Sequence, residues 1–295
     1  MAVNGSLGSD CFKFNFAIVS RISKTFVDSS TFPLRDGQTI NLEKARKEHE
    51  DLVEALRRVG LDVIELPTDD NNPDGIFVGD IAVVINGTAL MCNPPTIKDK
   101  PTRQRELVVV RQVLRKELGL KVIEVETEKA IIEGGDVLWT GREIFVGLSE
   151  RTNLLGAQMV AKAFPEYPTT VVKVYPPAFH LKDYIGMAGP EIMVIGKSDG
   201  AQKTFAEIRN SGAIGYKYIS VDEDEAANVI YVNRTLLHLN QDQIPKGAAV
   251  YLNKIDFSRV SIKMEEPLKR GCSLTNCILL VNRVRHPKKI PTTVQ

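Results

Sequence analysis

The residue types in this sequence that could do chemistry are a thiol, a histidine and several carboxylates. Cys277 lies in the stretch RGCSLTNCILLVNR (270–283), which holds two of the chain's four cysteines. A thiolate is a strong nucleophile, so Cys277 is a candidate to attack an electrophilic carbon. The alternative is a buried, inert thiol next to an apolar strand, and this segment alone does not decide between the two.

A carboxylate and a histidine are the candidate partners of such a thiol. Glu133 precedes two glycines and a hairpin in IIEGGDVLWTGREIFVGLSERTN (131–153), where the glycines would let a ligand or another backbone approach. The alternative is a tight turn whose acid caps backbone amides. His180, in PPAFHLKDYIGMAGP, is a candidate general acid or base, or else a structural histidine. The acidic stretch 69–75 precedes a strand and ends near Asp80, and most of it is expected to be a solvated loop.

Motifs for phosphate and metal chemistry are missing from the sequence. It contains no GxxxxGK[ST], no HExxH and no CxxC. Cys272 and Cys277 are separated by four residues and have no histidine nearby, which makes a poor metal site. We therefore expect no metal and no cofactor.

The charge balance limits the class of partner. The chain has 38 basic and 37 acidic residues, a net charge of +1, so no strong field favours nucleic acid or an anionic membrane. The first residues lack a signal-peptide pattern, and no run of about 18 apolar residues occurs. The scattered cysteines are expected to stay reduced. We expect a cytoplasmic protein with a small-molecule partner, and the sequence does not determine its oligomeric state.

Hairpin-like segments recur along the chain. Residues 79–93 and 135–149 both open with Gly-Asp, continue apolar, turn at a glycine and become apolar again. Residues 226–240 and 276–284 echo this pattern more weakly. A recurrence at a spacing of roughly 50–60 residues favours a pseudo-symmetric repeat fold.

Helices are expected between these hairpins. Apolar spacing predicts them over 42–59, 102–118, 151–164 and 200–211, with Asn41 capping the first and Gly119 ending the second. The first two lead into the strand-like LDVIELP and LKVIEVE, which is α/β order. No Pro/Gly/Ser linker divides the chain. We expect one domain over 12–285, with flexible tails at 1–11 and 286–295.

Taken together, these segments resemble the dimethylarginine dimethylaminohydrolase family, within the guanidine-modifying superfamily. The likeness runs from about Phe14 to Arg283 and is most specific in EGGDVLWTGREIFVGLSERTN, HLKDYIGMAGP, PDGIFVGDIAVV and LTNCILLVN. The resemblance implies a single-domain, five-bladed α/β propeller (the pentein fold) with the active site at its centre. It also implies thiol-dependent hydrolysis of methylated arginine to citrulline and methylamines.

The resemblance also implies roles for three candidate catalytic residues. Cys277 would be the nucleophile that attacks the central carbon of the guanidinium. His180 would be the general acid and base, and Glu133 would orient it. The attack of Cys277 would give a covalent, thiouronium-like intermediate, which water would then hydrolyse.

The substrate-binding residues come from the resemblance alone. Asp80 would hold the guanidinium through charge-assisted hydrogen bonds. Arg103 and Arg151 would bind the α-carboxylate of the substrate. The α-amino group would meet Asp74 and the backbone of Leu34.

Three positions depart from the family pattern. Gly79 stands where a glutamate is usual, and Gly271 stands where a further acid is usual. An ungapped alignment on LLVNR places Asn276 at the nucleophile position and Cys277 one residue later. Because side chains alternate along a strand, Cys277 would then point away from the site unless a bulge or loop restores its aim. These departures leave two alternatives open: a catalytically degenerate binding protein, or a hydrolase of another guanidine or amidine compound.

Overall fold

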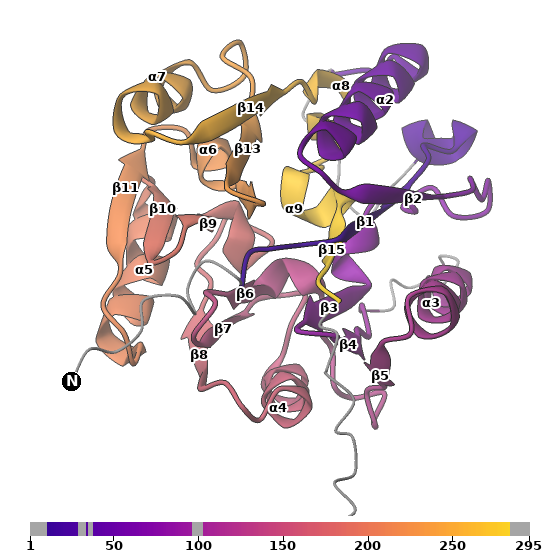
Figure 1. The fold of residues 1–295 in the computed structure, drawn as a ribbon, viewed down its shortest axis with the longest axis horizontal. Coiled ribbons are helices and arrows are strands. Elements are labelled where there is room, and N and C mark those ends of the chain that lie inside the picture. Colours follow the sequence, from indigo (N-terminus) through magenta and orange to yellow (C-terminus); the bar gives the residue numbers. More distant parts are fainter. Residues whose placement is uncertain (1–10, 29–33, 35–37, 96–102, 284–295) are drawn as a thin grey trace, which may run out of the picture.

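A computed structural model describes residues 11–28, 34, 38–95 and 103–283 (Figure 1). The expected tails 1–11 and 286–295 lie outside these residues, apart from Cys11.

The described strands form five three-stranded sheets that share one pattern. In each sheet an inner strand pairs antiparallel with a middle strand, which pairs parallel with an outer strand. In the order inner, middle, outer, the sheets are β15 (Leu279–Val281), β1 (Phe16–Ser20), β2 (Asp62–Leu66); β3 (Ala82–Ile85), β4 (Thr88–Met91), β5 (Lys121–Ile123); β6 (Val137–Trp139), β7 (Ile144–Leu148), β8 (Thr169–Lys173); β9 (Ile185–Gly189), β10 (Ile192–Gly196), β11 (Lys217–Val221); and β12 (Ile230–Val232), β13 (Thr235–Leu239), β14 (Ser258–Ile262).

One helix connects the middle strand of each sheet to its outer strand. These helices lie at the periphery in Figure 1 and are α2 (Leu42–Arg58), α3 (Gln104–Gln112), α4 (Leu154–Ala163), α5 (Asp199–Ser211) and α7 (Pro245–Lys254). The ring closes where the last strand pairs with the first, with Val281 opposite Phe16. The arrangement is a five-bladed α/β propeller, so the predicted fold class is confirmed.

A short helical turn precedes every inner strand. The turns are η2 (Val78–Asp80), η4 (Gly134–Asp136), η5 (Leu181–Asp183), α6 (Asp224–Ala227) and α9 (Leu274–Cys277). Successive turns contact one another: η2 packs on η4, η4 on η5, η5 on α6, and α9 on both η2 and η4. The five blades thus bring residues from distant parts of the sequence together at one end of the central axis. The remaining short helices are η1 (Lys24–Asp28) and α8 (Glu265–Leu268).

The predicted helices are present with small differences at their ends. The side chain of Asn41 accepts a hydrogen bond from the Lys44 amide at 3.0 Å and caps α2, as expected. Helix α3 continues as one π-helical turn, η3 (Val113–Glu117), before Gly119, whose φ of 67° ends it. Residues 276–284 do not form the weak hairpin echo that the sequence suggested: they hold the inner strand β15, whose partner is β1.

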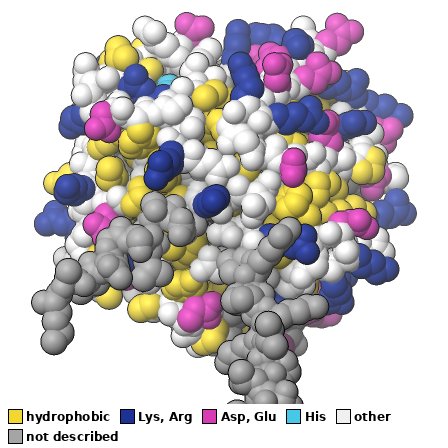
Figure 2. Space-filling view, viewed as in Figure 1, with side chains coloured by type: hydrophobic (Ala, Val, Ile, Leu, Met, Phe, Trp, Pro, Cys, Tyr) yellow, Lys and Arg dark blue, Asp and Glu magenta, His cyan; other side chains and the backbone are white. Residues whose placement is uncertain are grey.

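Apolar packing between the blades and their helices forms the core. The largest fully buried side chains include Phe26, Phe145, Tyr184 and Tyr251. Basic and acidic side chains are interspersed on the face shown in Figure 2, as the near-neutral net charge predicts. In the part of the chain that the structure describes, no helix is long and apolar enough to cross a membrane.

Candidate active site

The helical turns at the centre of the propeller carry the candidate catalytic side chains. Asp80 is the last residue of η2, and Cys277 is the last residue of α9. Glu133 and His180 precede η4 and η5 as their N-cap residues. Because the turns contact one another, four residues spread over 198 positions of sequence belong to one cluster of turns.

His180 and Glu133 form a buried pair. Nε2 of His180 lies 2.6 Å from Oε2 of Glu133, and each residue is only 2% exposed. The Asp183 carboxylate accepts hydrogen bonds from the amides of Phe179 and His180, at 3.0 and 2.9 Å, and so fixes the turn that holds the imidazole. The sequence had suggested only a loop at this point, and Asp183 was not among the predicted site residues.

Charges around His180 keep its imidazole protonated. Burial by itself would lower the pKa of His180, but the charge of Asp80 and the hydrogen bond to Glu133 outweigh burial and raise it to about 10. Burial likewise opposes ionisation of Glu133, yet the hydrogen bond and charge of His180 leave the pKa of Glu133 below its ordinary value. The pair is therefore an imidazolium and a carboxylate at neutral pH, and its imidazolium can donate a proton.

Asp80 has one carboxylate oxygen without a partner. Its Oδ1 accepts a hydrogen bond from the Gly135 amide at 3.0 Å, whereas its buried Oδ2 has no hydrogen-bond partner among the described residues. Burial raises the pKa of Asp80 to about 7, and the charge of His180 opposes the rise. A buried carboxylate oxygen with no partner is costly, so this atom is suited to a cationic ligand.

The two glycines after Glu133 allow the turns to approach closely. A Cβ on Gly135 would lie 2.6 Å from the His180 ring and 3.0 Å from Oδ1 of Asp80. A Cβ on Gly134 would lie 2.1 Å from the carbonyl oxygen of Gly79. The distances of 2.6 and 2.1 Å are shorter than real Cβ contacts. The glycines at 134 and 135 therefore serve close approach, one of the two possibilities that the sequence left open.

Asp136 bonds to the residue that follows His180 and was also not among the predicted site residues. It is fully buried, its Oδ1 accepts from the Leu181 amide at 2.9 Å, and its Oδ2 accepts from the Ser149 hydroxyl at 2.7 Å. Burial raises the pKa of Asp136 to about 6. Like Asp80, it ends its turn and accepts from a backbone amide in or next to the following turn. The repeated Gly-Asp at the start of both hairpins was the sequence signal for this shared role.

Both predicted arginines lie near the pair. Nη1 of Arg151 is 3.7 Å from Oε1 of Glu133, and the Arg151 guanidinium lies 5.9 Å from the centre of the Phe179 ring. The Arg103 guanidinium is held by the Glu106 carboxylate, at 2.9 and 3.1 Å, and by the Phe77 carbonyl at 2.6 Å. Glu106 is thus a partner of Arg103 that the sequence did not reveal.

An open pocket adjoins the site. It has a volume of about 1080 Å³, and its lining includes Leu34, Phe179, Asn228 and Cys272. Leu34 and Phe179, the residue that precedes His180, thus both line this pocket. The expected solvated loop is correct for most of 69–75 but wrong for Asp74, which is only 9% exposed.

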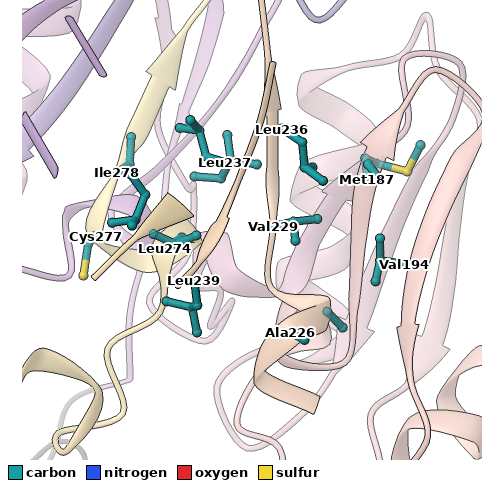
Figure 3. Close-up of a cluster of buried hydrophobic side chains, with 14 of the residues drawn as sticks. Met187, Val194, Ala226, Val229, Leu236, Leu237, Leu239, Leu274, Cys277 and Ile278 are labelled. Atoms are coloured by element: carbon teal, nitrogen blue, oxygen red, sulfur yellow. The ribbon is translucent and has the colours of Figure 1, made fainter. Parts of the chain in front are cut away.

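Cys277 ends a helical turn and does not lie in a strand. Its side chain is fully buried at the edge of the apolar cluster in Figure 3, where the sulfur points away from Leu237 and Ile278. The sulfur lies 3.4 Å from Oδ1 of Asn276. Successive residues of a helix differ in direction by about 100°, so the expectation of strict alternation from Asn276 to Cys277 does not hold here.

The side chain of Asn276 has a structural use in this turn. Its Oδ1 accepts a hydrogen bond from the Ser273 amide at 2.8 Å and caps the start of α9. The same oxygen is the neighbour of the Cys277 sulfur. Asn276 therefore shapes the turn that carries the thiol.

Gly79 gives α9 room to approach the centre. A Cβ at this position would lie 2.3 Å from the carbonyl oxygen of Thr275 and 2.9 Å from those of Asn276 and Ile278. The side chain of a glutamate could not be added without moving this backbone. Gly79 therefore permits the close packing of α9 on η2.

Three side chains at the centre have ligand atoms of the kind that bind metals. Oxygen or nitrogen atoms of Asp80, Glu133 and His180 all lie within 4.8 Å of one another. A cation there would have to replace the 2.6 Å hydrogen bond between His180 and Glu133. That hydrogen bond thus already occupies two of the three groups.

A five-bladed propeller with a buried imidazole–carboxylate pair and a cation-binding carboxylate at its centre defines an enzyme of the guanidine-modifying class. A sequence profile described as "N,N dimethylarginine dimethylhydrolase, eukaryotic" matches residues 25–183. The putative hydrolase DDAH2 of Homo sapiens is 36% identical over 253 residues, covering 83% of this chain and 87% of that protein. The chain belongs to the dimethylarginine dimethylaminohydrolase family, as the motifs predicted.

More distant relatives share the family name and the fold. The N(G),N(G)-dimethylarginine dimethylaminohydrolase of Streptomyces coelicolor is 29% identical over 223 residues, 73% of this chain and 80% of that protein. The solved structure of the Pseudomonas aeruginosa enzyme, a cysteine-to-serine mutant in complex with citrulline, superposes with a TM-score of 0.77 and 21% identity. It covers 91% of this chain and 100% of the other. This likeness confirms the pentein fold.

Proposed function

We propose that this protein hydrolyses methylated arginine to citrulline and a methylamine, with Cys277 as the nucleophile. The observation that carries the proposal is the buried His180–Glu133 pair beside the unpartnered oxygen of Asp80. Family membership supports the reaction, since relatives in Streptomyces coelicolor and Pseudomonas aeruginosa are named dimethylarginine dimethylaminohydrolases. The citrulline in the Pseudomonas complex supports the product.

Substrate binding would rest on charge. The guanidinium would donate to Oδ2 of Asp80, which has no partner among the described residues. The α-carboxylate would pair with Arg151 and Arg103, and the α-amino group would meet Asp74 and the backbone of Leu34. Leu34 lines the pocket beside the His180 turn, which supports entry of the substrate from that side.

The first chemical step forms a covalent intermediate. The Cys277 thiolate attacks the guanidinium carbon, and a C–S bond forms. The His180 imidazolium gives its proton to the departing amine as the C–N bond breaks, and neutral methylamine or dimethylamine leaves. Glu133 keeps the imidazole in position and stabilises its charged form.

The second step regenerates the enzyme. Neutral His180 takes a proton from a water molecule, which attacks the carbon of the thiouronium adduct. The C–S bond then breaks, the thiolate of Cys277 leaves, the remaining proton of the attacking water passes to solvent, and citrulline is released. His180 ends the cycle protonated, as its raised pKa requires.

Two features of the turns support Cys277 over Asn276 as the reacting residue. An amide does not attack a guanidinium carbon, and the Asn276 side chain is already bonded to the Ser273 amide. Cys277 ends α9 as Asp80 ends η2, and the Asp80 side chain is directed at the neighbouring turn. Cys277 is thus carried by a turn that packs on both η2 and η4.

The cytoplasm is the proposed location because the cysteines are reduced. All four cysteines are free thiols. Thiols persist in the reducing cytoplasm, where a thiol-dependent enzyme of this kind would work.

Citrulline release tests the proposed function. Purified protein would be incubated with asymmetric dimethylarginine and, separately, with monomethylarginine. We expect citrulline from at least one, none from Cys277→Ser, and an unchanged rate for the control Cys11→Ser, whose thiol contacts the Gly141 carbonyl away from the turns. Absence of citrulline from the wild-type protein with both substrates would reject the proposal.

A further inference from the structure

A second cavity lies inside the propeller and shares its floor with the active site. Its volume is about 150 Å³, and residues of all five inner strands or the turns before them line it. The floor includes Gly79, Gly134 and Thr275, which belong to the same turns that carry Asp80, Glu133 and Cys277. The cavity and the active site are therefore neighbours, separated by the ring of turns.

The walls of this cavity are apolar and partly aromatic. Phe12, Trp139 and Tyr231 form one aromatic group, with ring centres 6.0 Å apart between Phe12 and Trp139 and 5.4 Å apart between Phe12 and Tyr231. The other walls come mainly from aliphatic side chains such as Val84 and Ile230. An engineered apolar cavity of about 150 Å³ is known to hold a benzene molecule, so the space suits one small ring or a branched hydrocarbon group.

Lys182 brings a positive charge to this apolar space. Its ammonium carries three N–H donors, and one of them bonds to the Gly134 carbonyl at 2.9 Å. No aspartate or glutamate is among the residues that line the cavity. The acids that balance Lys182, Asp80 and Asp136, lie on the active-site side of the turns. Burial lowers the pKa of Lys182, and these acids oppose that effect.

The indole N–H of Trp139 is a second hydrogen-bond donor among the residues that line the cavity. Nε1 of Trp139 is buried and has no hydrogen-bond partner among the described residues. A buried N–H without an acceptor is costly, and in native proteins such a group is normally satisfied by protein, water or ligand. The cavity thus combines two donor groups, one of them charged, with apolar walls.

We propose that this cavity is a binding site for a small organic carboxylate with an apolar body, whose oxygens are bonded by the Lys182 ammonium. The apolar body fills the space between the inner strands, and the carboxylate supplies the negative charge that the lining lacks. The proposal does not depend on the hydrolase activity, because it uses neither Cys277 nor the His180–Glu133 pair.

The fluorescence of Trp139 gives a direct test, because it is the only tryptophan of the chain. Benzoate is titrated into the full-length protein and compared with benzyl alcohol and benzylammonium, which have the same ring but a neutral or positive group. We expect a saturable change with benzoate and at least about tenfold weaker binding of the other two, since a hydrogen bond to a charged group contributes about 1.5–3 kcal/mol. Equal affinity for benzoate and benzyl alcohol, or no saturable change with benzoate, overturns the proposal.

Two variants locate the bound carboxylate. Lys182→Met keeps the length of the side chain without its charge, and we expect at least about a tenfold loss of benzoate affinity. Lys173→Met is the control, since Lys173 is exposed and lies over the Tyr175 ring outside the cavity, and it should bind as the wild type does. Unchanged affinity in Lys182→Met contradicts the proposal. If that variant does not fold, the comparison of the three ligands on the wild-type protein still decides.

Discussion

Oε2 of Glu133 lies 2.6 Å from Nε2 of His180, and both residues are buried at the centre of the propeller. They are 47 residues apart in sequence. The charge of Asp80 and this contact together raise the pKa of the imidazole against the effect of burial, so that His180 stays protonated at neutral pH. A protonated histidine can give its proton to a leaving amine.

The first prediction concerns pH. Guanidinium binding requires ionised Asp80, so kcat/KM should rise as the pH rises through about 7, the pKa of Asp80. Protonation of the leaving amine requires charged His180, so kcat/KM should fall as the pH approaches about 10. Initial rates of citrulline formation between pH 5.5 and 10.5, roughly the range that brackets both groups, measure this profile. A profile that falls from pH 6 to pH 8 would contradict these assignments.

Replacing Glu133 by glutamine tests its role as the partner of His180. The amide can keep a hydrogen bond but not the charge, so we expect kcat to fall by about 10²–10⁴-fold. The alkaline limb of the pH profile should also move to lower pH, because the charge that raises the pKa of His180 is lost. Glu126→Gln, at an exposed ion pair with Lys162, is the control and should change neither. A reduced rate with an unmoved alkaline limb would indicate a structural role only.

A methyl group at Gly135 should disturb catalysis more than stability. The added Cβ would lie 2.6 Å from the His180 ring, so the imidazole must shift. A misplacement of about 1 Å can cost about 10² in rate, and we expect a fall of that size in kcat for Gly135→Ala. Gly215→Ala is the matched control, since a Cβ there meets nothing within 4 Å. Equal kcat values in the two variants would exclude the close contact as a requirement.

Gly79→Ala should lower stability. The Cβ would lie 2.3 Å from the Thr275 carbonyl, and backbone cannot move aside as easily as a side-chain end. We expect the free energy of unfolding in urea to fall by about 1–3 kcal/mol, as for other overpacked sites. With Gly215→Ala again as reference, a neutral Gly79→Ala would show that α9 does not need this glycine. Gly79→Glu, which restores the usual family residue, should be at least as destabilising.

The sequence predicted the fold and several residues of the candidate site for identifiable reasons. The Gly-Asp hairpins at 79–93 and 135–149 carried both the strand pattern and the two aspartates that end their turns. Asp183 and Lys182 gave no such signal, because their partners are backbone groups. These are the amides of its own turn for Asp183 and the Gly134 carbonyl of a neighbouring blade for Lys182. Local sequence also could not show that Cys277 ends a helical turn, since four residues are too few for a helical period.

The most direct test of the central claim is the site of the covalent intermediate. Wild-type protein is quenched with acid during turnover of asymmetric dimethylarginine, digested, and the peptides that contain Cys272 and Cys277 are sequenced by mass spectrometry. We predict a substrate-derived mass on Cys277 and none on Cys272, together with loss of the adduct in Cys277→Ser. Citrulline formation with the adduct on Cys272, or with Cys277→Ser still active, would contradict the account.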